Sequence, residues 1–187
     1  MKAMSKTSRI RIIGGLQRRQ IIQFPDRPAL RPTPDRVRET LFNWLGQDLT
    51  GKTCLDLFAG SGVLGFEALS RGAIKVVMVE HDSATFASLQ QNAKRLALEK
   101  DLKLVKQDAL TFIAQPQEKF DLIFLDPPYQ SNYLSQVLTA IPKFLTAEGL
   151  VYVESPKSFK LPSEWQILRQ GQAGQVCYQL IQWNKHD

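Results

Sequence analysis

The sequence is poor in the residues that bind metals and in long apolar runs. Among 187 residues there are two cysteines, Cys54 and Cys177, and two histidines, His81 and His186. The cysteines lie in apolar, strand-like segments without a Cys-x-x-Cys motif, so we expect buried thiols and no metal site. No apolar stretch approaches the roughly 20 residues of a membrane span, and the N-terminus lacks a signal core. These absences favour a cytoplasmic protein with no membrane partner.

Most of the chain carries no net charge, because its basic and acidic residues balance. Residues 51–187 hold fourteen basic and fourteen acidic residues, whereas residues 1–50 hold ten basic and four acidic residues and so carry the whole net charge of +6. Arginine dominates the first segment, and arginine binds phosphate bidentately and stacks on bases. We therefore predict contact with RNA; the alternative is a solvated basic face. The candidate contacts are Arg11, Arg18, Arg19, Arg31, Arg36 and Arg38.

The first fifty residues form a predicted extension. Residues 9–24 alternate apolar and polar around a Gly-Gly pair, which predicts a β-hairpin. Four prolines then make residues 25–34 an extended connector. A helix should follow, with Thr33 or Asp35 as its cap.

Beyond residue 50, strands and helices alternate. The expected strands are 53–58, 75–80, 102–107, 121–126 and 150–154, and the expected helices are 63–71, 83–98, 109–114 and 133–145. This order predicts a doubly wound parallel sheet. Residues 165–169 and 175–183 are joined by too short a link for a helix and should pair antiparallel. The predicted fold is α/β, a seven-stranded, mostly parallel sheet ending in an antiparallel hairpin, with the extension (1–50) preceding the core (51–187).

A glycine-rich loop follows the first core strand. Gly60, Gly62 and Gly65 match G-x-G-x-x-G, and Glu80 ends the second core strand, where it can accept hydrogen bonds from ribose hydroxyls. The pattern fits a dinucleotide or S-adenosylmethionine. Asp56 favours the second, because a carboxylate near the helix start suits an ammonium group and opposes a pyrophosphate.

The predicted cofactor contacts surround this loop and the ends of the next two strands. Asp108 ends the third core strand and is expected to accept from an adenine amino group, to cap the next helix, or to do both. The full predicted set is Asp56, Phe58, Ala59, Gly60, Ser61, Gly62, Glu80, Asp108 and Ala109.

The most informative segment is Asp126-Pro127-Pro128-Tyr129, which follows an apolar strand. The prolines must stop the strand, so the segment lies at the carboxyl end of a parallel strand, where ligands bind in such folds. Asp126 and the Pro127 carbonyl could hold a planar amino group while Tyr129 stacks on its base. These four are the predicted catalytic residues. The alternative is a Pro-Pro turn that only closes the strand.

Seven blocks of the chain resemble the RsmD family: 11–15 (RIIGG), 30–45 (LRPTPDRVRETLFNWL), 56–65 (DLFAGSGVLG), 67–73 (EALSRGA), 126–129 (DPPY), 152–154 (YVE) and 173–176 (AGQV). The resemblance implies a class I methyltransferase fold and S-adenosylmethionine-dependent methylation of a guanine 2-amino group in 16S ribosomal RNA, with a small-subunit assembly particle as partner. One departure is Arg18-Arg19-Gln20, where the family has Arg-Gly-Arg or Arg-Gly-Lys. Methylation of DNA or tRNA bases, an NAD-dependent oxidoreductase and a non-catalytic ribosome-assembly factor are the alternatives.

Overall fold

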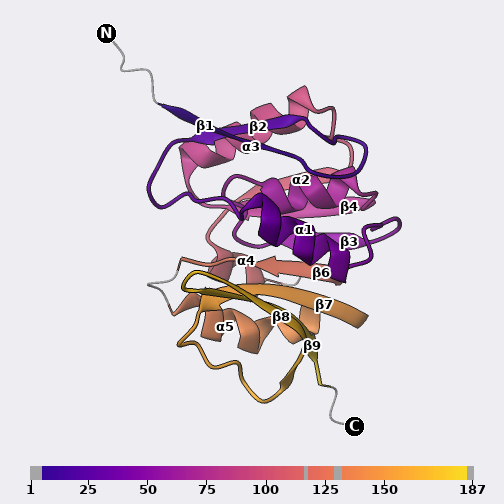
Figure 1. Ribbon diagram of the computed structural model, residues 1–187, viewed down its shortest axis with the longest axis vertical. Coiled ribbons are helices and arrows are strands. Elements are labelled where there is room, and N and C mark those ends of the chain that lie inside the picture. Colours follow the sequence, from indigo (N-terminus) through magenta and orange to yellow (C-terminus); the bar gives the residue numbers. More distant parts are fainter. Residues whose placement is uncertain (1–5, 116–117, 129–131, 185–187) are drawn as a thin grey trace.

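The computed structural model describes residues 6–115, 118–128 and 132–184 (Figure 1). Within these ranges no helix is long and apolar enough to cross a membrane. The elements in chain order are β1 (Thr7–Arg11), β2 (Ile21–Pro25), α1 (Asp35–Trp44), β3 (Thr53–Asp56), α2 (Val63–Ser70), β4 (Lys75–Glu80), α3 (Ser83–Arg95), β5 (Leu102–Lys106), α4 (Ala109–Ala114), β6 (Phe120–Leu125), α5 (Tyr133–Ala140), the 3-10 helix η1 (Ile141–Phe144), β7 (Leu145–Pro156), β8 (Trp165–Ala173) and β9 (Val176–Trp183).

A seven-stranded sheet organises the chain. Its strand order is β5-β4-β3-β6-β7-β9-β8. The first five of these strands run parallel, while β9 pairs antiparallel with both β7 and β8. The order reverses direction at β3, so a crevice for a ligand is expected beside its carboxyl end. The predicted fold class is confirmed.

Two apolar layers cover the two faces of the sheet. On one face α1, α2, α3 and the hairpin β1–β2 pack around residues such as Phe42, Phe66 and Phe124. On the other face α4, α5 and η1 pack around residues such as Ile123 and Val153. Neighbouring residues of β6 alternate between the two layers, as the pleat of a strand requires.

The predicted N-terminal hairpin is confirmed, since β1 and β2 pair antiparallel. Ile12, Ile22 and Phe24 are buried in the same apolar layer as the α1–α3 side of the sheet. The side chain of Asn92 on α3 also pairs with the backbone of β2: its Nδ2 donates to Gln23 O at 2.7 Å, and its Oδ1 accepts from Gln23 N at 3.1 Å. Figure 1 shows the hairpin lying along α3. The extension is therefore packed into the core.

A buried ion-pair network fixes α1 against α2. The Glu67 carboxylate accepts from Arg38 Nη1 at 2.7 Å, from Arg71 Nε at 3.2 Å and from the backbone N–H of Ile13 at 2.6 Å. Arg38 also pairs with Asp35 and is completely buried. Burial lowers the pKa of Arg38, and the two carboxylates oppose that shift. The prediction that Arg38 contacts RNA is wrong, because its guanidinium is enclosed and paired.

Several expected boundaries need correction. Pro34 is the N-cap residue of α1, so neither Thr33 nor Asp35 caps that helix. The helix expected over 133–145 ends at Ala140, with Pro142 in a short 3-10 turn, and β7 therefore begins at Leu145 instead of 150. The last hairpin is longer than expected, with β8 reaching Ala173.

Only one of the two thiols is fully buried. Cys54 is enclosed in β3, as predicted, whereas Cys177 is half-buried. Among the described residues no group of three His, Cys, Asp or Glu side chains is placed to hold a metal ion.

Candidate active site

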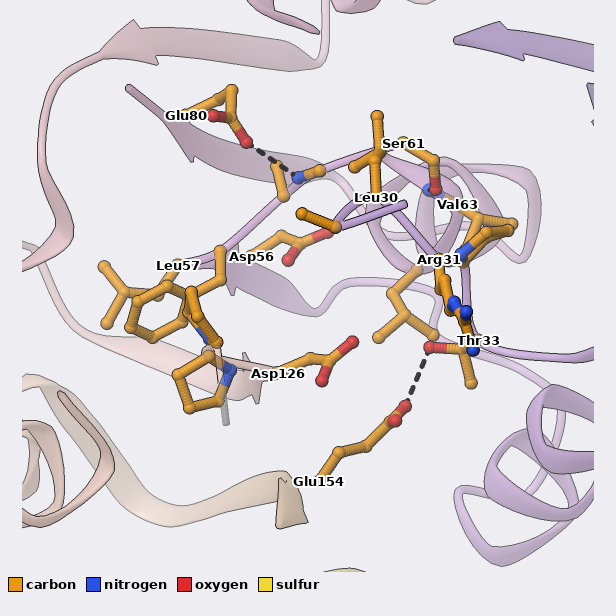
Figure 2. Close-up of a pocket in the computed structure, with 18 of the residues that line it drawn as sticks. Leu30, Arg31, Thr33, Asp56, Leu57, Ser61, Val63, Glu80, Asp126 and Glu154 are labelled. Carbon is orange, nitrogen blue, oxygen red and sulfur yellow. Dashed lines mark hydrogen bonds between the residues drawn. The ribbon is translucent and has the colours of Figure 1, made fainter. Parts of the chain in front are cut away.

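A cavity of about 890 Å³ opens at the carboxyl ends of the parallel strands. Its walls are the loop after β3, the ends of β4, β6 and β7, and the connector over residues 27–34 (Figure 2). All the predicted cofactor contacts except Gly62 line it, as do Asp126, Pro127 and Pro128. Tyr129 lies outside the described residues. The cavity thus brings together two motifs that are about 65 residues apart in the sequence.

The glycine loop is shaped by backbone conformations that favour glycine. Gly60 has a φ of +53°, and its N–H donates to Glu80 Oε2 at 3.0 Å. A Cβ on Gly60 would approach Leu30 Cδ1 to 3.0 Å at the cavity wall. Gly62 has a φ of +80°, and a Cβ there would collide with Leu89 and Phe66. Gly62 therefore serves the turn into α2, and its cofactor contact stays a prediction.

Asp56 ends β3 as a buried carboxyl group at the start of α2. Its Oδ2 accepts from the backbone N–H of Gly65 at 3.2 Å. Burial raises the pKa of Asp56 to about 7; the Gly65 bond lowers it and the charge of Glu80 raises it further. A carboxylate thus occupies the helix terminus where a dinucleotide fold binds pyrophosphate. The position favours a cationic ligand group.

Glu80 is held in place by the backbone around it. Its Oε2 binds Gly60 N, and its Oε1 accepts from Asp82 N at 2.8 Å. Each carboxylate oxygen has a second lone pair, so Glu80 can still accept from ribose hydroxyls in the cavity. His81 is exposed and lies beside this carboxylate, with 3.4 Å between Nδ1 and Oε1.

Asp108 is the N-cap of α4. Its Oδ1 accepts from Leu110 N at 2.9 Å and from Thr111 N at 3.1 Å, and its Oδ2 accepts from the Tyr133 hydroxyl at 2.9 Å. The capping alternative is therefore confirmed, while the adenine contact stays a prediction. Tyr133 also packs edge-to-face on Phe58, with 5.7 Å between ring centroids. Tyr133 was not predicted to lie at the site, because the helical pattern of α5 gives its first residue no distinguishing feature.

Asp126 directly follows β6, as the two prolines predict. The structure gives its carboxylate no hydrogen-bond partner among the described residues, and the group faces the cavity. Burial, and then the nearby charges of Glu154 and Asp56, raise the pKa of Asp126 well above its ordinary value. Pro127 is buried and Pro128 is exposed. Asp126 thus presents an acceptor to the cavity that none of the described residues satisfies.

The connector and Glu154 complete the cavity; of these residues only Arg31 was predicted to belong to a site, as an RNA contact. The Thr33 hydroxyl donates to Glu154 Oε1 at 2.7 Å, and Arg27 Nη1 donates to Asp82 Oδ1 at 2.9 Å. Figure 2 shows Leu30 and Arg31 beside the glycine loop, with the Thr33–Glu154 bond across the cavity. The available signal was an acidic residue at the carboxyl end of the strand over 150–154, the same signal that identified Asp126.

The predicted RNA contacts other than Arg38 are exposed, but they do not form one group. Arg31 lines the cavity, and Arg11 pairs with Asp35 at 3.3 Å. Arg18 and Arg19 lie in the hairpin turn, which bonds to Ser70 at the far end of α2. Leu64 on the first turn of α2 lines the cavity, and Ser70 lies six residues further on, so the turn contacts α2 about 9 Å along the helix from the cavity wall.

Comparison with known proteins gives a consistent result. The family described as "Conserved hypothetical protein 95" matches residues 10–182. The ribosomal RNA small subunit methyltransferase D of Escherichia coli K12 is 43% identical over 183 residues, which is 95% of this chain and 92% of that protein. The protein of the same name from Haemophilus influenzae is 41% identical over 180 residues, 92% of this chain and 93% of that protein. A solved structure from Escherichia coli, provisionally named a methyltransferase, is 40% identical with a TM-score of 0.86 and covers 96% of this chain and 100% of that one.

Proposed function

The chain belongs to the conserved hypothetical protein 95 family, which is the RsmD family, and on that basis we propose that it methylates the 2-amino group of one guanine in small-subunit ribosomal RNA, with S-adenosylmethionine as donor. Methyltransferase activity on ribosomal RNA follows from the family. The cofactor, the guanine and the 2-amino group are the finer proposal.

One observation carries this proposal. Asp126, which has no hydrogen-bond partner among the described residues, faces the same cavity as Asp56, Gly60 and Glu80. An acceptor for an amino group and a nucleoside-binding loop therefore share one chamber. A Pro-Pro turn that only closed a strand would not require an unsatisfied carboxylate in such a place.

The residues of the cavity fit S-adenosylmethionine. Asp56 suits the ammonium group, Glu80 suits the ribose hydroxyls, and the region between Asp108 and Phe58 suits the adenine ring. When bound, this cofactor supplies an electrophilic methyl group on a positively charged sulfur. A pyrophosphate would instead meet the Asp56 carboxylate at the start of α2, which argues against the NAD-dependent alternative.

Asp126 and Pro127 would bind the amino group that receives the methyl. The lone pair of a guanine 2-amino nitrogen is delocalised into the ring, so this nitrogen is a poor nucleophile. Hydrogen bonds from its two N–H groups to the Asp126 carboxylate and the Pro127 carbonyl would draw the lone pair out of the ring plane. They would also stabilise the positive charge that develops on nitrogen, which is electrostatic preorganisation. The predicted stacking of Tyr129 would add about 1–3 kcal/mol.

When Asp126 is ionised, both of its carboxylate oxygens can accept a hydrogen bond from the amino group. The pKa of Asp126 is raised by burial, and further because the nearby charges of Glu154 and Asp56 repel another negative charge. A sulfonium and an ammonium group would place two positive charges in the cavity and so favour ionisation of its carboxyl groups. Cofactor binding would thereby prepare Asp126 for its role.

A small-subunit assembly particle in the cytoplasm is the proposed partner. Arg31 at the cavity wall would contact RNA near the target base, and Arg18 and Arg19 would contact it further away. Binding at two separated positions on a structured RNA is a means of selecting one guanine among many.

The test uses methyl-labelled S-adenosylmethionine with four substrates: small subunits lacking the modification, naked 16S ribosomal RNA, tRNA and DNA. We expect label on one guanine of the ribosomal RNA, located by nuclease mapping, and identified as 2-methylguanine by mass spectrometry. The Asp126→Ala variant is the background control. Label confined to tRNA or DNA would replace this proposal with the corresponding alternative, and no label on any substrate would contradict it.

A further inference from the structure

Glu154 and Asp126 occupy corresponding positions on adjacent parallel strands. Leu125 of β6 pairs with Val153 of β7, so the next residue of each chain segment, Asp126 and Glu154, lies side by side at the sheet edge. Neighbouring strands are about 4.8 Å apart. Leu125 and Val153 pack in the α4–α5 layer, so the two acids face the opposite side, where the cavity lies. Figure 2 shows both carboxyl groups directed toward the same part of the cavity.

Among the described residues, hydrogen-bond donors reach one oxygen of Glu154. The hydroxyls of Thr33 and Tyr152 both donate to Oε1, at 2.7 and 2.9 Å. No described residue donates to Oε2, although the side chain lines the cavity and the residue is only 6% exposed. A carboxylate oriented by two hydroxyls, with its other oxygen unpaired at a binding cavity, is arranged to accept a hydrogen bond from a ligand.

The two acceptors match the edge of a guanine. Guanine presents an N1–H donor directly beside its 2-amino group, whereas adenine has an unprotonated acceptor at N1. If Asp126 and Pro127 hold the 2-amino group, the adjacent acceptor should receive N1–H. A base with an acceptor at N1 would instead meet a carboxylate, which is repulsive. The protein should discriminate strongly between the two bases, because the wrong base would leave the buried carboxylate unpaired.

We propose that Glu154 is the specificity-determining residue that recognises guanine by accepting a hydrogen bond from its N1–H at Oε2. This assignment rests on the proposed function. Thr33 and Tyr152 are positioning residues, because they orient the carboxylate and do not touch the base. The two hydroxyl donors also favour the ionised form of Glu154, which opposes the increase of its pKa caused by burial.

The test changes one hydrogen-bonding group on the base, from a donor to an acceptor, and one on residue 154, from an acceptor to a donor. The target guanine, once mapped, is replaced by 2-aminopurine, which keeps the 2-amino group but has an acceptor at N1 and lacks O6; the Glu154→Gln variant isolates the contribution of N1. Single-turnover methylation is measured on both RNAs, at saturating cofactor, for the wild-type protein and for Glu154→Gln. In this variant Oε1 can still accept from Thr33 and Tyr152, whereas an NH₂ group replaces Oε2.

We expect the wild-type protein to prefer guanine over 2-aminopurine by roughly 10- to 100-fold, the value of one hydrogen bond to a charged group. Glu154→Gln should abolish or reverse that preference, because its NH₂ group donates to the N1 acceptor. Thr33→Val is the matched comparison: it removes one of the two hydrogen bonds that orient the carboxylate and keeps Oε2 as an acceptor, so it should reduce the preference for guanine only in part and should not reverse it.

Two results would overturn the assignment while the proposed function stands. One is equal methylation of the two RNAs by the wild-type protein, a measurement that needs no variant. The other is a Glu154→Gln protein that binds S-adenosylhomocysteine normally but keeps the wild-type preference or loses activity equally on both RNAs. A wild-type protein inactive on the guanine RNA would overturn the proposed function itself.

Discussion

The carboxylate of Asp56 accepts a hydrogen bond from the backbone N–H of Gly65 at 3.2 Å, nine residues further along the chain. The bond joins the end of β3 to the first turn of α2 across the glycine loop. It places an acid, with a pKa raised by burial to about 7, where related nucleotide-binding folds hold a phosphate. The first prediction follows from that placement.

The affinity for an ammonium-bearing cofactor should rise with pH. Ionised Asp56 attracts the ammonium group, and the protonated form does not, so raising the pH from 6 to 8 should tighten S-adenosylhomocysteine binding by about tenfold. Isothermal titration calorimetry measures this directly. Methylthioadenosine lacks the amino-acid part and is the matched control, for which we expect little dependence on pH. The same pH dependence for both ligands would exclude Asp56 as the ammonium partner.

Replacing Asp126 should affect turnover and leave cofactor binding almost unchanged. The loss of one preorganised acceptor costs about 10²–10³ in rate, so we expect that decrease in single-turnover methylation by Asp126→Ala. Asp126→Asn keeps one acceptor oxygen and should lose less. Calorimetry with S-adenosylhomocysteine provides the binding measurement. Full activity of Asp126→Ala would refute the role of this carboxylate.

The exposed arginines of the hairpin turn should make RNA binding depend on salt. Arg18→Gln removes one phosphate contact, which should reduce the slope of log K against log salt concentration by about 0.7–0.9. Arg169→Gln removes another exposed charge, from β8, and is the control. Filter binding over a range of salt concentrations measures both slopes. Identical slopes for the two variants would mean that Arg18 contributes only general charge.

The hairpin turn should be stabilised by restoring glycine at position 19. Arg19 has a φ of +72°, a left-handed conformation that costs a non-glycine residue about 1–2 kcal/mol. Part of this gain is offset because glycine has more freedom in the unfolded chain, so Arg19→Gly should raise the free energy of unfolding by about 0.5–1 kcal/mol. Urea denaturation measures the change.

Arg18→Gly is the control for that substitution, since Arg18 is not among the residues with positive φ. It should lower the free energy of unfolding, because it adds freedom to the unfolded chain and relieves no strain. Equal effects of the two glycine substitutions would show that the left-handed conformation of Arg19 carries no strain.

The sequence was most informative where a residue type or a short pattern determines the local backbone structure. The alternation of apolar strands with helices predicted the sheet, and Pro127 predicted the end of β6 and thus the position of Asp126. In each case the constraint is local, so it can be recognised without knowing the fold.

Residues whose partners are distant in the sequence could not be interpreted in this way. Arg38 looked like one more exposed arginine, because its partner Glu67 is 29 positions away on another helix. Thr33 looked like a helix cap, yet its hydroxyl binds Glu154, 121 positions further on. The unfavourable position of Arg38 in the first turn of α1 was the only local sign of a buried anion nearby.

The pairing of Asn92 with β2 has a consequence for how the chain is made. Protein synthesis releases the N-terminal residues first, but the backbone of Gln23 finds its partner only when the amide of residue 92 has been added. Similarly, the backbone N–H of Ile13 can donate to Glu67 only after residue 67 has been added. The segment that leaves the ribosome earliest therefore stays incomplete, and open to other contacts, until about half of the protein has been translated.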